Sequence, residues 1–179
     1  VGLRFRNIPV PNGATIDAAY FIFHSHEGKS TDDVARITIV GDATDNAETF
    51  TEDALIDARP QTDASVLWEV AEEWEIYQPY NSADITPIVQ ELVDRNGWEA
   101  GNAMAFVLLG ENQGPSDFEN AREFESFENI ADPADGGDGQ HHPERVPQLV
   151  IQYSSPNSTS VNEIFVPAAK ELQLFPNPV

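Results

Sequence analysis

Short strand-like runs separated by turn residues constrain the fold of this chain more than any other feature. The runs are alternating or β-branched and cover residues 3–8, 15–24, 34–40, 65–70, 103–109 and 148–153. Turn-rich pieces such as Pro9–Gly13 and Gly110–Gly114 separate them, as is typical of strand boundaries. A parallel sheet would need a helical crossover between most strands. The pattern therefore predicts an all-β fold, a jelly-roll-like β-sandwich.

One segment, about residues 86–96, has the features of an α-helix. Thr86 is placed to cap its start, Pro87 suits the first helical position, and Gly97 follows its end. The apolar residues share one face at helical spacing: Ile85, Ile88, Val89, Leu92 and Val93. We expect this face to pack against the sandwich, because a single apolar stripe is typical of a helix that covers a core.

The chain divides into one domain and a tail. Its 179 residues, with 40% hydrophobic residues, suit a single core, which we assign to residues 1–153. Residues 154–160 are hydrophilic and rich in Ser, and they predict a linker. Residues 161–179 predict a strand-forming tail, the start of another domain or a donated strand, whose candidate assembly residues are Ile164, Val166, Leu172, Leu174 and Phe175.

The charge excludes several partners. The chain carries 31 Asp and Glu against 9 Lys and Arg, which gives a formal net charge of -22. Nucleic acid and anionic membranes are poor partners for such a surface. No stretch approaches the roughly 20 apolar residues that span a bilayer, so we expect no membrane insertion. The chain has no cysteine, which excludes disulfides and thiolate metal sites.

Two acidic loops predict a structural calcium site. Asp42, Asp45 and Glu48 lie close together in one loop, and the second loop repeats Asp every third residue among glycines, at Asp132, Asp135 and Asp138. Calcium takes 6 to 8 oxygen ligands, and glycine-rich loops let backbone carbonyls converge on an ion. The spacing does not fit an EF-hand. The alternative is a solvated acidic surface without a specific ion.

Catalytic motifs are missing from the sequence. It contains no Gly-x-Ser-x-Gly elbow, zinc-protease His-Glu motif or phosphate-binding Gly loop. His24 and His26 share a strand and His141 and His142 are adjacent, but the spacing supplies no third metal ligand. We therefore expect a protein that is not an enzyme, although chance pairs among 31 acids leave glycoside hydrolysis formally open.

Three aromatic residues are candidates for sugar contact. Trp74, Tyr77 and Tyr80 lie in a segment with Pro and Glu, outside the expected strands. Aromatic rings offer flat apolar faces on which sugar rings stack. The alternative, which we favour, is that these rings pack within the core or its loops.

Most of residues 1–153 resemble a known group of domains. The likeness is carried by Val1–Phe23, Gly41–Phe50, Ile85–Trp98 and Pro147–Tyr153, which are similar to the DNRLRE-type and carbohydrate-binding-module-like jelly rolls of large secreted bacterial proteins. The resemblance implies an extracellular location and a binding or structural role. It implies no catalytic residues.

The last residues resemble a second family. Glu171–Val179, with its Leu-Phe-Pro-Asn-Pro run, looks like the start of the C-terminal sorting domain of type IX secretion substrates. That family is confined to Bacteroidota-like bacteria, so the resemblance implies export to the cell surface or beyond it.

These observations lead to two functional hypotheses. The first is a non-enzymatic extracellular structural or adhesive module, stabilised by calcium, which polymerises into fibres by strand addition of its tail. Its partners would be copies of itself or neighbouring domains of the same surface protein. The second is a carbohydrate-binding module of a secreted polysaccharide-processing protein, whose partner would be an extracellular polysaccharide.

Overall fold

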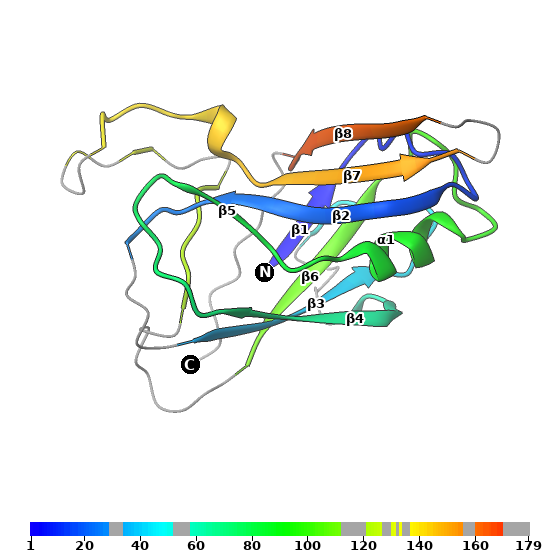
Figure 1. Ribbon diagram of the computed structural model, residues 1–179, viewed down its shortest axis with the longest axis horizontal. Helices are drawn as coiled ribbons and strands as arrows, with labels where there is room; N and C mark the ends of the chain where they lie inside the picture. The colour runs from blue at the N-terminus through cyan, green and yellow to red at the C-terminus, as the bar shows by residue number, and fades with distance from the viewer. Residues whose placement is uncertain are drawn as a thin grey trace.

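The computed structural model shows a sandwich of two antiparallel sheets (Figure 1). It describes residues 1–28, 34–51, 58–111, 121–126, 130–131, 133, 137–155 and 160–169. The first sheet has the order β1 (Gly2–Phe5), β6 (Met104–Gly110), β3 (Ala35–Asp42) and β4 (Gln61–Val70). The second has the order β5 (Pro79–Asn81), β2 (Thr15–His24), β7 (Gln148–Ser154) and β8 (Val161–Pro167). The predicted all-β sandwich with one short α-helix is confirmed.

Strand β2 shows how side-chain alternation builds the core. Ala19, Phe21 and Phe23 point inward and are buried, while the residues between them are less buried. Ile16 is also buried, which breaks the alternation by one residue. The pairing of β2 with β7 has an irregularity between Ile16 and Ala18, and such a bulge shifts which residues face inward.

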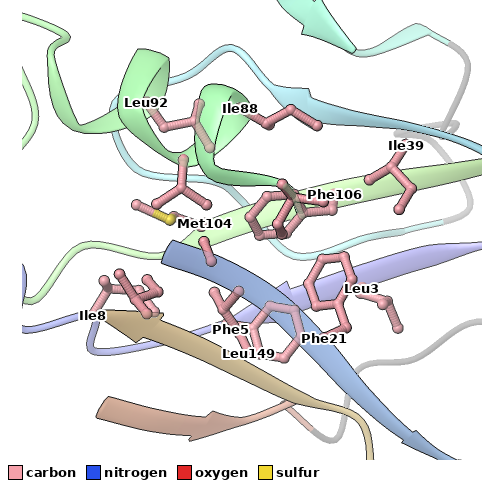
Figure 2. Close-up of a cluster of buried hydrophobic side chains, with 14 of the residues drawn as sticks. Leu3, Phe5, Ile8, Phe21, Ile39, Ile88, Leu92, Met104, Phe106 and Leu149 are labelled. Atoms are coloured by element: carbon pink, nitrogen blue, oxygen red, sulfur yellow. The ribbon is translucent and has the colours of Figure 1, made fainter. Parts of the chain in front are cut away.

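Aromatic rings lie among aliphatic side chains in the core between the sheets (Figure 2). Phe21 stacks on Phe5 with ring centroids 5.6 Å apart and meets Phe106 edge-on at 5.0 Å. Such pairs contribute beyond the area that they bury. Because the three rings come from β1, β2 and β6, they tie the two sheets together.

Helix α1 (Thr86–Val93) covers one flank of this core. It ends three residues before the predicted end, and Asp84 rather than Thr86 accepts the hydrogen bond at its start, from the Thr86 backbone N–H at 2.9 Å. Gly41 of β3 lets the helix come close, since an added Cβ would lie 2.9 Å from Ile88 and 3.2 Å from Leu92. No helix in the described part of the chain has the length and apolarity needed to cross a membrane.

Strand β8 is the last described strand and belongs to the second sheet. All seven of its residues pair with β7 of the same chain, from Val161 opposite Ser154 to Pro167 opposite Gln148. Beyond it the chain reaches the other sheet, where Ala168 bridges to Phe5 of β1. Residues 156–159 of the predicted linker and residues 170–179 of the predicted tail lie outside the described residues.

Candidate functional site

The side of the sandwich formed by β4 and β5 has side-chain caps at both ends of β4. The Glu91 carboxylate of α1 accepts the backbone N–H groups of Asp63 and Ala64 in the edge strand β4, at 2.9 and 2.8 Å. At the other end of β4, the Arg122 guanidinium donates to the carbonyl oxygen of Val70 at 3.1 Å. We call this side, formed by the outer edges of β4 and β5, the capped side.

Aromatic packing closes the same side. The Trp74 ring is 1% exposed, stacks on Tyr80 at 4.7 Å between centroids and lies 6.3 Å from the Trp68 ring. Strand β5 is only three residues long and begins with Pro79. A short edge strand with a proline offers little to another strand, because proline has no backbone N–H to donate.

The opposite side is formed by the outer edges of β1 and β8, and we call it the open side. The two strands stand at the ends of their sheets, and β8 lies along the margin of the molecule in Figure 1. Among the described residues, the link between them is at one end, where Ala168 bridges to Phe5 and the Ala169 N–H donates to the Arg4 carbonyl oxygen at 2.8 Å.

The backbone of β8 is available for pairing along this side. Ala168 donates to Pro147, which is its partner in the ladder with β7. Hydrogen-bonding direction alternates along an antiparallel strand, so Val161, Glu163 and Phe165 direct their backbone polar groups away from β7. Within the described residues, no side chain caps these groups.

The side chains of β8 divide between two faces. Ile164 and Val166, which the sequence predicted as assembly residues, are half-buried against the core of their own chain. Val161 and Phe165 are 61% and 56% exposed. Natural edge strands are usually protected by charges, proline or coverage. Here Glu163 is the one charged residue and Pro167 the one proline of the strand, so the stretch from Val161 to Phe165 is protected by a single charge.

The first predicted calcium loop is held by arginines. Asp42 is 2% exposed and lies 2.6 Å from Arg59, which also donates to the backbone carbonyls of Glu48 and Thr49 at 3.0 and 2.8 Å. Asp45 pairs with Arg95 at 2.7 Å. A guanidinium supplies the positive charge and the hydrogen bonds that balance a carboxylate, so these two carboxylates do not need a metal ion for this purpose. Across the described residues, no group of three His, Asp or Glu side chains is arranged to hold a metal ion.

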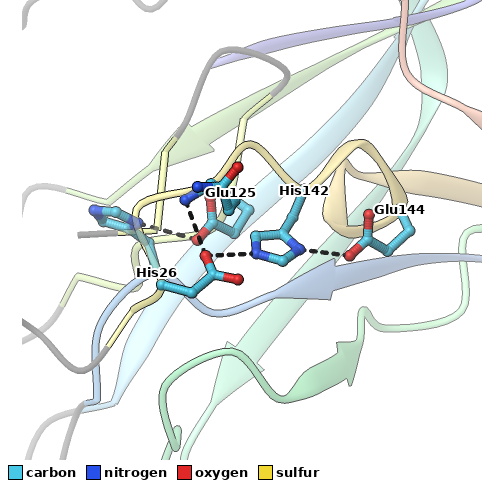
Figure 3. Close-up of polar contacts among 6 residues, drawn as sticks. His26, Glu125, His142 and Glu144 are labelled. Atoms are coloured by element: carbon cyan, nitrogen blue, oxygen red, sulfur yellow. Dashed lines mark hydrogen bonds and ion pairs between the residues drawn. The ribbon is translucent and has the colours of Figure 1, made fainter. Parts of the chain in front are cut away.

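The second predicted calcium loop contains a histidine bound by two carboxylates (Figure 3). His142 Nε2 lies 3.0 Å from Asp138 Oδ1, and His142 Nδ1 lies 2.7 Å from Glu144 Oε1. Because ionised carboxylates only accept hydrogen bonds, this arrangement favours the protonated ring, in which both ring nitrogens donate. Asp132 and Asp135, the other members of this predicted site, lie outside the described residues.

The histidines of the chain differ in their electrostatics. The hydrogen bond to Asp138, followed by the one to Glu144, raises the pKa of His142. Burial lowers the pKa of His24 at the end of β2. His26 lies 3.3 Å from the buried Glu125. The sequence signal for this cluster was the close spacing of Asp138, His142 and Glu144. It was missed because the repeated aspartates were followed instead.

The predicted sugar-contact residues do not form an exposed row. Trp74 and Tyr80 are brought together, but in a stack whose Trp member is buried. Tyr77 has a φ of 62°, and its ring lies under the Arg145 guanidinium, 4.5 Å from the ring centroid. The faces of Trp74 are therefore not offered to a sugar ring.

Comparison with known proteins found no matching family model, and no curated protein or solved structure gave a significant match.

Proposed function

We propose that this chain is a non-enzymatic structural or adhesive module that joins other copies of itself by strand addition along the open side. The observation that carries the proposal is β8, a seven-residue edge strand with outward backbone groups and exposed Val161 and Phe165. An unpaired edge of this kind is a template for another strand, and backbone hydrogen bonds supply the affinity.

The contrast with β4 supports this proposal. Both strands are sheet edges, yet Glu91 and Arg122 cap β4 and no described side chain caps the outward groups of β8. A protein that remained a monomer would benefit from the same protection on both sides. The open edge is therefore best explained as a contact surface.

The part of the predicted tail that follows β8, residues 170–179, could link copies into longer assemblies. The ten residues 170–179 follow Ala169, which already donates to Arg4 of β1. Ten extended residues span about 33 Å, far enough to reach a neighbouring copy. We propose that this tail, with Leu172, Leu174 and Phe175, links copies into fibres outside the cell, a location that rests on its resemblance to a sorting domain.

We expect calcium to favour assembly by reducing the repulsion between copies. Copies with a formal net charge of -22 repel one another, and divalent cations that bind carboxylates would relieve the repulsion. Because Asp42 and Asp45 are paired with arginines, we expect calcium to act on the remaining acidic residues rather than on these two.

The proposal is tested by electron microscopy and light scattering of the purified chain, with and without calcium at matched ionic strength. A variant that ends at Ala169 separates the tail from the edge. We expect ordered assemblies with the full chain, promoted by calcium, and only small oligomers with the shortened one. A compact monomer in every condition would contradict the proposal and favour carbohydrate binding.

A further inference from the structure

The outer face of the second sheet carries an apolar row that ends at the open side. Tyr20 of β2 pairs with Val150 of β7, and Val150 pairs with Phe165 of β8. Val150 is fully buried although it lies outside the main core, as expected for a small residue between two rings. Phe165 is 56% exposed. The row therefore stops at a ring with no further described strand beside it.

The two strands of this face nearest the open side, β7 and β8, are also nearly free of charge. Strand β7 contains no charged residue, and β8 contains only Glu163. The Gln152 amide donates to the Glu163 carboxylate at 2.6 Å, which partly compensates this charge. In a chain with a net charge of -22, two copies repel each other least where such a face meets its equal.

Pairing of two identical antiparallel strands allows only a few registers. The outward backbone groups of β8 alternate, so the two-fold axis can pass between two copies of Glu163, of Phe165 or of the intervening Ile164. The Ile164 register sets each Glu163 carboxylate against a Phe165 ring of the second copy and separates the two rings, which makes it less favourable than a pair of rings. The first register places two carboxylates opposite each other, which is unfavourable. The second places two aromatic rings opposite each other, a favourable cross-strand pair, and sets Glu163 opposite the uncharged Pro167 of the second copy.

We propose that two copies pair through antiparallel β8 strands, with Phe165 opposite Phe165 of the second copy. The two four-stranded sheets then become one sheet of eight strands, and the apolar row continues across the two-fold axis. This inference rests on the proposed function and specifies its contact. A two-fold contact closes after two copies, so longer assemblies need the tail as a second contact.

The contact is small. One strand from each copy buries less area than the about 1,600 Å² of a typical stable complex. We therefore expect a weak dimer, with a dissociation constant in the micromolar range or above. Covalent trapping is the appropriate measurement, because it records an encounter that is populated only part of the time.

Cysteine crosslinking tests the register without interference, because the chain has no cysteine. In a hydrogen-bonded antiparallel pair the Cα atoms lie about 5.5 Å apart, within the range of about 4.4 to 6.8 Å that a disulfide spans. We expect Phe165→Cys to form disulfide dimers under mild oxidation. The matched control, Leu67→Cys, is exposed on β4 of the capped side and should crosslink at least tenfold more slowly, at a rate set by random collision.

A second pair of variants keeps the Phe165 ring in place. Glu163→Cys and Pro167→Cys stand opposite each other in the proposed register, so a mixture of the two should form the mixed disulfide. Neither variant alone should crosslink faster than Leu67→Cys.

The outcomes separate this inference from the proposed function. If the chain self-associates by light scattering but Glu163→Cys crosslinks with itself and the mixture does not, the register is wrong while assembly stands. The proposed pairing is also wrong, while assembly stands, if the chain self-associates but no β8 variant crosslinks faster than Leu67→Cys. If the unmodified chain stays monomeric at every concentration, both proposals fall.

Discussion

The two lateral sides of this sandwich meet the same physical problem in different ways. Each side ends in edge strands whose backbone groups need partners. On the capped side, Glu91, Arg122 and the Trp74 ring cover the edge. On the open side, no described side chain caps the outward groups of β8, and the Phe165 ring is left exposed. From this difference we propose that the capped side serves stability and the open side serves contact.

The largest expected effect compares one aromatic residue from each side. Trp74→Ala removes a fully buried ring and should lower the free energy of unfolding by about 3 to 5 kcal/mol. Phe165→Ala removes an exposed ring and should lower it by about 1 kcal/mol or less. Urea unfolding followed by circular dichroism measures both. Equal losses would show that the open side is part of the folding core.

A smaller effect is expected from the cap on β4. Glu91→Ala leaves two backbone N–H groups without their carboxylate partner and should lower stability by about 1 to 2 kcal/mol. It should also increase self-association, because a second edge becomes available. Glu99→Ala removes an exposed carboxylate that makes no such bonds and is the matched control. If both variants associate equally, loss of charge rather than loss of the cap is responsible.

The smallest effect concerns the loop around His142, which belongs to neither side. Because the pKa of His142 is raised, its ion pairs with Asp138 and Glu144 stabilise the loop fully below the ordinary pKa of 6.5. This stabilisation is lost as the pH rises through the raised pKa. The lowered pKa values of Asp138 and Glu144 imply a second loss at acidic pH, below their ordinary values of 3.8 and 4.5.

Hydrogen exchange of residues 137–145, corrected for intrinsic rates, should therefore show protection falling as the pH rises above the ordinary histidine pKa of 6.5. His142→Gln should remove this dependence without changing self-association at the open side. An unchanged pH profile in the variant would mean that another group controls the loop.

Much of the fold could be predicted from the sequence because it depends on local patterns. Alternation identified most strands, and Pro87 with the apolar stripe identified α1. The helix end was placed too late because Gly97 was interpreted as a helix stop. In the structure a side chain at Gly97 would collide with Asp45, so this glycine serves a contact with a distant loop.

The site was harder to predict because it depends on contacts between distant residues. Spacing grouped Asp42 with Asp45, whereas the structure pairs them with Arg59 and Arg95, 17 and 50 residues further along the chain. Strand β8 has apolar residues on both faces, so alternation alone does not tell which face is exposed. Its register with β7 decides that Val161 and Phe165 point outward.

The most direct test of the account is sedimentation velocity over a wide range of protein concentrations, for the unmodified chain and two lysine variants. Phe165→Lys places like charges opposite each other on the open side and should weaken association at least about tenfold. Leu67→Lys makes the same change at a residue of similar exposure on β4 and should leave association unchanged. Equal association of all three proteins, or a greater loss with Leu67→Lys, would contradict the assignment of the open side as the contact surface.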